Sequence, residues 1–143
     1  MFEIKIKYFC NDLIKLEKID KGDWIDLRAS EDIVLMEGDF KYIPLGVAMQ
    51  LPEGYEAHIA PRGSTFKNWG ILQTNSIGIV DESFCGSDDQ WHYAVYATRY
   101  TKIKKNDRIA QFRIIEKMHS IKFTEVESLS ENNRGRDGST GIN

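Results

Sequence analysis

Short runs of β-forming residues, separated by turn sequences at regular intervals, constrain the fold of this chain more than any other feature. Residues 2–8 alternate charged and apolar side chains with a period of two, which is typical of a half-buried strand. Seven further runs predict strands, at Ile33–Met36, Tyr42–Met49, Tyr55–Ala60, Ile77–Val80, Trp91–Thr98, Arg108–Ile115 and Ile121–Val126. Turn signals lie at residues 21–23, 37–39, 51–54 and 105–107. Many short strands at this spacing predict an all-β sandwich or barrel.

Two segments depart from this rhythm. Residues Pro61–Gly70 are compatible with a short helix that ends at Gly70. The polar C-terminal segment Ser128–Asn143 is rich in glycine, serine and asparagine, which favours a mobile tail. We therefore expect a β domain over residues 1–129 and a flexible C-terminal arm over residues 130–143.

Length and charge narrow the class of protein. The 143 residues suit one domain with its own core, and the net charge of −3 favours neither nucleic acid nor an acidic membrane surface as a partner. No apolar run approaches the ~20 residues of a membrane-spanning helix. The two cysteines, Cys10 and Cys85, match no metal or redox spacing, so we expect free thiols in the reducing cytoplasm.

A carboxylate at the end of a predicted buried strand is a candidate general base. The segment from Asn75 to Asp81 reads as a tight hairpin with Gly78 near the bend, and Asp81 follows a β-branched pair. A carboxylate held there can accept a proton from water. From this segment alone, an ordinary turn aspartate is the preferred interpretation.

Two segments carry groups that suit a phosphate. Arg62 and Ser64 precede the possible helix, although simple N-capping by Ser64 or Thr65 explains them equally well. Arg134 precedes the glycine-rich residues 135–141, whose backbone N–H groups suit an anion if the tail is ordered. A disordered tail is the stronger interpretation of that composition.

The strand predicted to open at residue 108 carries two more candidates. The period of two places Arg108 and Gln111 on opposite faces. We expect Arg108 to pair with a carboxylate, and Gln111 to be either a ligand donor or a half-exposed strand residue. The three histidines show no metal-binding spacing.

Taken in order, these segments resemble the five motifs of the homotrimeric dUTPases. Motifs one to five correspond to Gly22–Arg28, Pro61–Thr65, Asn75–Gly86, Asn106–Gln111 and Arg134–Gly141. The match spans nearly the whole chain, and the sequence resembles the short Bacillus and phage branch of the family most. The resemblance implies a jelly-roll-like fold, a homotrimer with three shared active sites, and Mg²⁺-assisted hydrolysis of dUTP to dUMP and pyrophosphate.

The resemblance also implies a role for each nucleoside-binding residue. Asp81 would activate the water that attacks the α-phosphorus. Asn75 and the main chain at Ser76 and Gly78 would read the uracil edge. Phe84 would pack under the deoxyribose, where it leaves no room for a 2′-hydroxyl. His92 stands at the position of a lid over the base.

The phosphate-binding residues follow from the same resemblance. They are Arg62, Gly63, Ser64, Gln111 and Arg134, together with Gly138, Ser139 and Thr140 of motif five. Asp26 would act through water near Mg²⁺, and Arg108 would brace the site. In the family, motifs one, two and four come from one subunit, motif three from a second and motif five from the third.

Several residues depart from the family pattern. Gly63 replaces the usual serine of motif two, Phe84 replaces a tyrosine, and Arg136 and Asp137 interrupt motif five. One alternative is therefore a catalytically weak homologue that binds or sequesters a nucleotide, or acts as a regulatory partner-binding protein. Another is dCTP deaminase, which shares the fold but needs a glutamate where this chain has Tyr93–Ala97.

Overall fold

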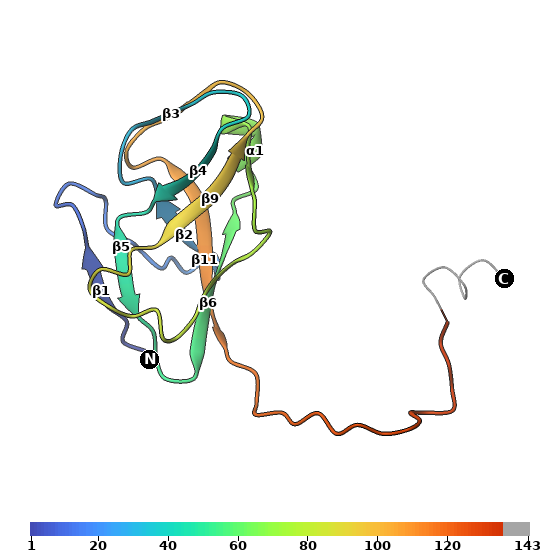
Figure 1. Cartoon of the computed structure of the whole chain (residues 1–143). Helices are drawn as coiled ribbons and strands as arrows, with labels where there is room; N and C mark the ends of the chain where they lie inside the picture. Colours follow the sequence, from blue (N-terminus) through green and yellow to red (C-terminus); the bar gives the residue numbers. More distant parts are fainter. Residues whose placement is uncertain (136–143) are drawn as a thin grey trace.

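The structure, a computed structural model, describes residues 1–135 and confirms the predicted all-β class (Figure 1). Its elements are β1 Lys5–Tyr8, β2 Ile25–Arg28, β3 Ile33–Leu35, β4 Phe40–Pro44, β5 Val47–Gln50, β6 Tyr55–Pro61, α1 Thr65–Trp69, β7 Ile71–Gln73, β8 Gly78–Val80, β9 His92–Ala97, β10 Thr101–Ile103 and β11 Arg108–Glu116. They form a body from which the C-terminal segment extends away.

All strand pairs among the described residues are antiparallel. The largest sheet has the order β2-β11-β6-β8, and a second sheet has the order β4-β9-β7. The pairs β1-β5 and β10-β3 complete the body. The long strand β11 lies between β2 and β6 and pairs with β6 from Ala110↔Pro61 to Glu116↔Tyr55. Because β11 joins these two strands, it brings residues of motifs one, two and four to one end of the sheet.

The core holds the inward-facing side chains of the sheets. Its largest members are Trp91, Tyr93 and Phe112, each 2% exposed or less. The rings of Trp91 and Phe112 meet edge to face with their centroids 5.1 Å apart, a geometry that favours aromatic pairs. Trp91 belongs to both the core and the lining of a pocket, so the core supports the site directly.

The predicted short helix that ends at Gly70 is confirmed as α1. Gly70 has a left-handed φ of 63°, and its N–H donates to the Phe66 carbonyl over 2.7 Å. Ser64 occupies the N-cap position without a capping side-chain hydrogen bond. The hydroxyl of the fully buried Thr65 instead accepts from the Arg62 N–H at 2.9 Å and donates to the Ile109 carbonyl at 3.0 Å.

The predicted strand at Tyr42–Met49 is in fact two strands. Gly46 interrupts it with a φ of 71°, and a Cβ there would come within 2.8 Å of the Ser30 Cβ. As a result β4 pairs with β9, whereas β5 pairs with β1.

The predicted hairpin around Gly78 is also wrong, because its two strands join different sheets. β7 pairs with β9, and β8 pairs with β6. The short strands β2, β7 and β10 were not predicted from the sequence; each has only three or four residues.

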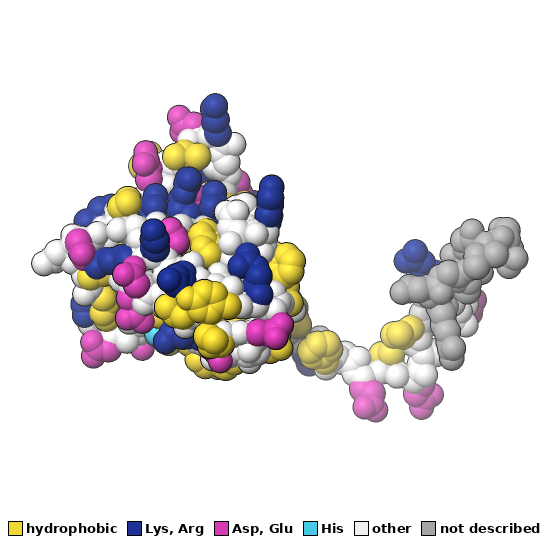
Figure 2. All heavy atoms as spheres, turned by 90° about the horizontal axis from the view of Figure 1, so that it is seen from above, with side chains coloured by type: hydrophobic (Ala, Val, Ile, Leu, Met, Phe, Trp, Pro, Cys, Tyr) yellow, Lys and Arg dark blue, Asp and Glu magenta, His cyan; other side chains and the backbone are white. Residues whose placement is uncertain are grey.

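Residues 117–135 contain no helix or strand, so the predicted strand at Ile121–Val126 is wrong. This segment, which we call the arm, extends from the end of β11 away from the body (Figure 1). Viewed from above in Figure 2, lysine and arginine side chains are spread over the body among acidic and hydrophobic ones, and the arm carries isolated hydrophobic, acidic and basic side chains. Phe123 is 93% exposed on it. No helix within residues 1–135 is long and apolar enough to cross a membrane.

Candidate active site

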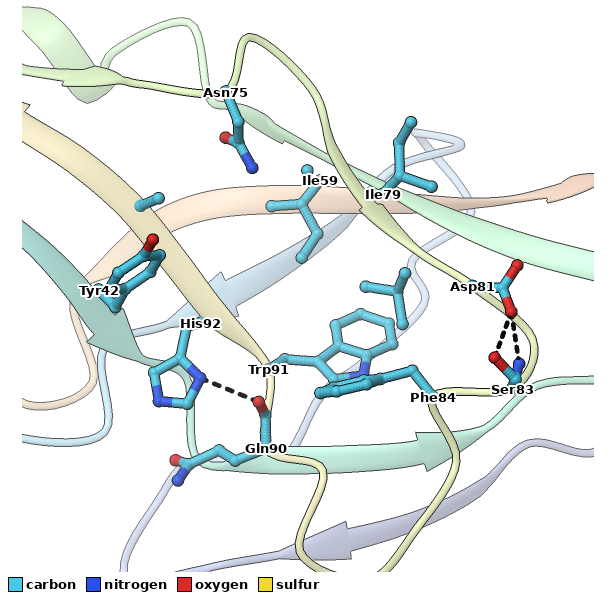
Figure 3. A pocket seen from close by; sticks show the side chains of 13 residues that line it. Tyr42, Ile59, Asn75, Ile79, Asp81, Ser83, Phe84, Gln90, Trp91 and His92 are labelled. Atoms are coloured by element: carbon cyan, nitrogen blue, oxygen red, sulfur yellow. Dashed lines mark hydrogen bonds between the residues drawn. The ribbon is translucent and has the colours of Figure 1, made fainter.

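A pocket of about 600 Å³ brings together most of the residues assigned to nucleoside binding and the candidate general base. Asn75, Gly78, Asp81, Phe84 and His92 all line it (Figure 3). They come from the turn before β8, from the first residue of β8, from the loop that follows β8 and from the start of β9. The lining is mostly apolar, which suits a base and a deoxyribose.

Asp81 follows β8 directly and is held by Ser83. The Ser83 N–H donates to Asp81 Oδ2 at 2.9 Å, and the Ser83 hydroxyl donates to the same oxygen at 2.5 Å. The hydroxyl of Ser83, followed by its backbone N–H, lowers the pKa of Asp81 below its ordinary value. The carboxylate is therefore ionised at neutral pH and ready to accept a proton.

The turn before β8 is narrow. Ser76 has a left-handed φ of 56°, and the Ile77 N–H donates back to the Asn75 carbonyl over 2.5 Å. At Gly78, an added Cβ would lie 3.2 Å from the Ile59 Cβ and 3.3 Å from Gln73 Nε2. The backbone at Gly78 therefore approaches the floor of the pocket more closely than a larger residue would allow. The side chain of Ser76 does not line the pocket.

Four polar or aromatic residues in the lining of this pocket were not among the residues assigned from the sequence: Tyr42, Ser83, Gln90 and Trp91. Gln90 connects to the lid position, because its carbonyl lies 2.9 Å from His92 Nδ1. Tyr42 comes from β4, far from motif three in the sequence, and only the pairing of β4 with β9 brings it to the pocket. Ser83 lies within motif three, and the hydroxyl two residues after Asp81 was a usable signal.

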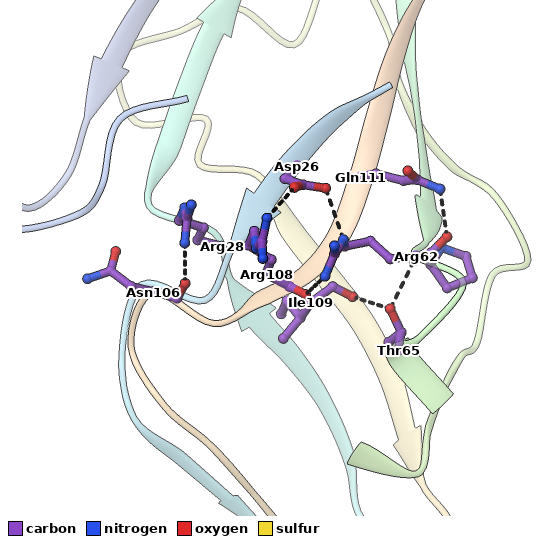
Figure 4. A network of polar contacts seen from close by, with 9 residues as sticks. Asp26, Arg28, Arg62, Thr65, Asn106, Arg108, Ile109 and Gln111 are labelled. Atoms are coloured by element: carbon purple, nitrogen blue, oxygen red, sulfur yellow. Dashed lines mark hydrogen bonds and ion pairs between the residues drawn. The ribbon is translucent and has the colours of Figure 1, made fainter. Parts of the chain in front are cut away.

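A second, more polar pocket of about 440 Å³ contains the residues assigned to phosphate binding on the body. Asp26, Arg62, Gly63, Ser64 and Gln111 line it. Asp26 is the centre of this cluster in Figure 4: its Oδ1 lies 3.0 Å from Arg62 Nε, and its Oδ2 lies 3.5 Å from Arg108 Nη1. Gln111 Nε2 donates to the Pro61 carbonyl at 3.0 Å. The ion pair between Arg108 and Asp26 confirms the prediction that Arg108 pairs with a carboxylate.

Arg108 and Gln111 line the same pocket, so the prediction of opposite faces is wrong. The register of β11 against β2 shifts between Arg108 and Ala110. A bulge of this kind adds one residue to a strand and reverses the faces of the side chains on its two sides. Strict alternation consequently fails at this point of the strand.

The second pocket also contains cations that sequence reasoning missed. Lys15, in the loop between β1 and β2, and Arg28, on β2, join Arg62 and Arg108 in its lining, against the acidic Asp26 and Glu17. Lys15 Nζ lies 3.9 Å from the centroid of the Tyr8 ring. The excess of cationic over acidic side chains makes this pocket suitable for the phosphates of a nucleotide.

Asp81 of the first pocket and Arg62 of the second lie near opposite ends of β6 within one chain. Val80 pairs with Ala57, so Asp81 lies level with Glu56, six residues before Arg62. At about 3.3 Å per strand residue, Asp81 and Arg62 are separated by roughly 20 Å. This distance is too long for both side chains of one chain to contact the same phosphorus.

The motif-five residues either lie away from both pockets or fall outside the residues that the structure describes. Arg134 is exposed on the arm. Gly138, Ser139 and Thr140 lie outside the described residues 1–135. Across these described residues, no three His, Cys, Asp or Glu side chains gather closely enough to hold a metal ion.

Comparison of the sequence with known families and proteins identifies similar chains. A sequence model of the dUTPase family matches residues 24–141. The SPbeta prophage-derived deoxyuridine 5'-triphosphate nucleotidohydrolase YosS of Bacillus subtilis (strain 168) is 55% identical over 139 residues, which cover 97% of this chain and 98% of that protein. The deoxyuridine 5'-triphosphate nucleotidohydrolase of Neorickettsia sennetsu is 37% identical over 121 residues, which cover 82% of this chain and 80% of that protein.

Solved structures show the same fold. A dUTPase of Staphylococcus bacteriophage 80alpha with bound dUpNHpp superposes with a TM-score of 0.79 at 18% identity, covering 99% of this chain and 100% of that chain. A dUTPase from phage phi11 of S. aureus, in which a structural Mg(II) ion is coordinated, superposes with a TM-score of 0.75 at 15% identity, covering 89% of this chain and 98% of that chain. At these identities the likeness establishes the fold alone.

Proposed function

The chain belongs to the dUTPase family and hydrolyses dUTP to dUMP and pyrophosphate, and from that premise we propose how its residues carry out the reaction. The observation that carries the proposal is the position of Asp81. Its carboxylate lies at the rim of an apolar pocket, beside the residues assigned to the base and the sugar, and is held ionised by Ser83. An ionised carboxylate in that place suits general-base catalysis.

In the proposed step, a carboxylate oxygen of Asp81 accepts a proton from water while the water oxygen attacks the α-phosphorus. A new P–O bond forms, and the bond from the α-phosphorus to the oxygen that bridges the α- and β-phosphates breaks. The electron pair of that bond remains on the leaving pyrophosphate. Because such chemistry depends on positioning and on charge neutralisation, the remaining residues act by binding.

The first pocket would bind the deoxyuridine part of the substrate. Asn75 and the backbone at Gly78 would hydrogen-bond the uracil edge, and the narrow turn before β8 would exclude a 5-methyl group. The half-exposed ring of Phe84 would lie under the deoxyribose and exclude a 2′-hydroxyl. His92 would cover the base from the other side.

The second pocket would bind the phosphates. Arg62 and Gln111 supply donors, Ser64 adds a hydroxyl and Gly63 adds a backbone N–H. Mg²⁺ held by the three phosphates would neutralise part of their negative charge. The chain suits a metal that arrives on the substrate, because the two oxygens of Asp26 face arginines and Asp26 would reach the ion only through water.

The separation of the two pockets supports a site shared between subunits. Since Asp81 and Arg62 of one chain lie roughly 20 Å apart, we infer that the Asp81 pocket of one subunit meets the Arg62 pocket of a neighbour in a homotrimer. Residues 130–143, which follow the domain of residues 1–129, would then bring Arg134, Gly138, Ser139 and Thr140 to the phosphates. The free thiols of Cys10 and Cys85 suit the reducing cytoplasm.

The proposal is tested by pyrophosphate release from dUTP with Mg²⁺, with dTTP, dCTP and UTP as controls. Selective turnover of dUTP is expected from the native chain, and Asp81→Asn should abolish turnover while dUTP still binds by calorimetry. Unchanged turnover in Asp81→Asn would mean that another group is the base. Binding without turnover in the native chain would favour the nucleotide-binding homologue instead. A monomer by light scattering would refute the shared site.

A further inference from the structure

Ser83, in the loop after β8, holds the Asp81 carboxylate ionised, and the direction of its two hydrogen bonds gives it a second role. We propose that Ser83 is a positioning residue for the base: its hydroxyl holds one oxygen of the Asp81 carboxylate and leaves the other to receive the proton of the attacking water. The inference rests on the proposed role of Asp81.

The two hydrogen bonds from Ser83 have a definite direction. The N–H and the hydroxyl both donate to Oδ2 of Asp81, at 2.9 and 2.5 Å. In Figure 3 the other oxygen, Oδ1, points away from Ser83. Two donors on one oxygen prevent the carboxylate from rotating freely about its last bond. They also reserve Oδ1 for water, because Oδ2 already accepts two hydrogen bonds.

A purely structural role of Ser83 in the loop would not require its hydroxyl. A turn of this kind needs only the backbone N–H of Ser83, so the hydroxyl is an additional donor. The loop is also held without it: Glu82 Oε1 accepts from the Gly54 N–H at 3.2 Å and from Lys117 Nζ at 2.8 Å. The Phe84 N–H donates to the Asp81 carbonyl at 3.0 Å. Removal of the hydroxyl should therefore leave the backbone of the loop in place.

The electrostatic effect of the contact agrees with its geometry. The hydroxyl of Ser83 is the largest cause of the lowered pKa of Asp81. A base with a lowered pKa is ionised over a wider pH range, so the contact should extend catalysis toward acid pH. A residue that only supported the loop would not move the acid limb of the pH–rate profile.

The experiment measures kcat and KM for dUTP between pH 4 and pH 9 in the full-length chain with Mg²⁺. In Ser83→Ala, kcat at the plateau should fall about tenfold, while KM stays within about twofold, because a poorly oriented base affects the chemical step. The acid limb of kcat should move to higher pH. Ser83→Thr, which keeps a hydroxyl, should restore the rate and the acid limb. Ser87→Ala removes an exposed hydroxyl from the same loop and should change neither.

The outcomes separate this inference from the function it rests on. A plateau rate and an acid limb in Ser83→Ala that match the native chain, with Asp81→Asn inactive, would overturn the positioning role and leave the base in place. Full activity in Asp81→Asn would overturn the proposed mechanism itself. If Ser83→Ala does not fold, Ser83→Gly provides a second hydroxyl-free variant with the same expected kinetics. A native profile in Ser83→Gly would overturn the inference equally.

Discussion

Replacing Thr65 with valine is expected to lower both the stability of the fold and the affinity for the substrate phosphates. Thr65 is fully buried, and its hydroxyl joins the Arg62 N–H, at 2.9 Å, to the Ile109 carbonyl, at 3.0 Å. Valine has nearly the same shape, so it opens no cavity but leaves both partners without their hydrogen bond. An unsatisfied buried group costs about 1–3 kcal/mol. Because water can reach the half-buried Arg62, the total loss should be about 2–4 kcal/mol.

The measurement is thermal unfolding at fixed subunit concentration, since association contributes to the stability of an oligomer. The Tm of Thr65→Val should fall by roughly 10 °C, and KM for dUTP should rise more than kcat falls, because the backbone of Arg62 is no longer held. Thr101→Val is the matched control: Thr101 is also buried, at 4% exposure, but its hydroxyl takes no part in the hydrogen bonds that join Arg62, Thr65 and Ile109. Equal losses in the two variants would refute the reasoning.

Three further changes test other parts of the site. Gly63→Ser should raise kcat more than it changes KM in steady-state kinetics, because nothing lies within 4 Å of an added Cβ and a hydrogen-bond donor to the transition state can raise the rate ~10²-fold. An unchanged kcat would show that Ser64 or the backbone already donates that hydrogen bond. Phe84→Ala should raise kcat/KM for UTP relative to dUTP about tenfold, and an unchanged ratio would exclude the ring from sugar selection. The hydrogen bond from Lys117 lowers the pKa of Glu82 in the folded chain. The contribution of this contact to stability is therefore complete above 4.5, the ordinary pKa of a glutamate, and is lost as the pH falls through the lower pKa of the folded state. The Tm of Lys117→Met should thus lie below that of the native chain at neutral pH and show less further loss on acidification to pH 3, whereas parallel curves would disprove the coupling.

The parts of the site that could be predicted from the sequence are those decided by neighbouring residues. Asn75, Gly78, Asp81 and Phe84 lie within ten residues, and the short turn and β8 carry them to one pocket. The end of α1 at Gly70 was predictable for a similar reason, since a left-handed C-cap depends on one residue.

The parts that could not be predicted depend on pairing with distant strands. Alternation alone placed Arg108 and Gln111 on opposite faces, but the shift in register against β2 brings them together. A short run of β-forming residues also predicted a strand at Ile121–Val126, yet a strand needs a partner and none pairs with it in residues 1–135. β7 and β8 are next to each other in sequence and still join different sheets.

The distance between the Asp81 and Arg62 pockets has a genetic consequence. If each site combines Asp81 from one subunit with Arg62 from another, an allele that has lost only Asp81 and an allele that has lost only Arg62 can complement each other. In trimers assembled at random from equal amounts of the two chains, about a quarter of the sites receive an intact residue from each side. Two inactive copies of the gene in one cell would then restore measurable activity, whereas two alleles damaged at the same residue would not.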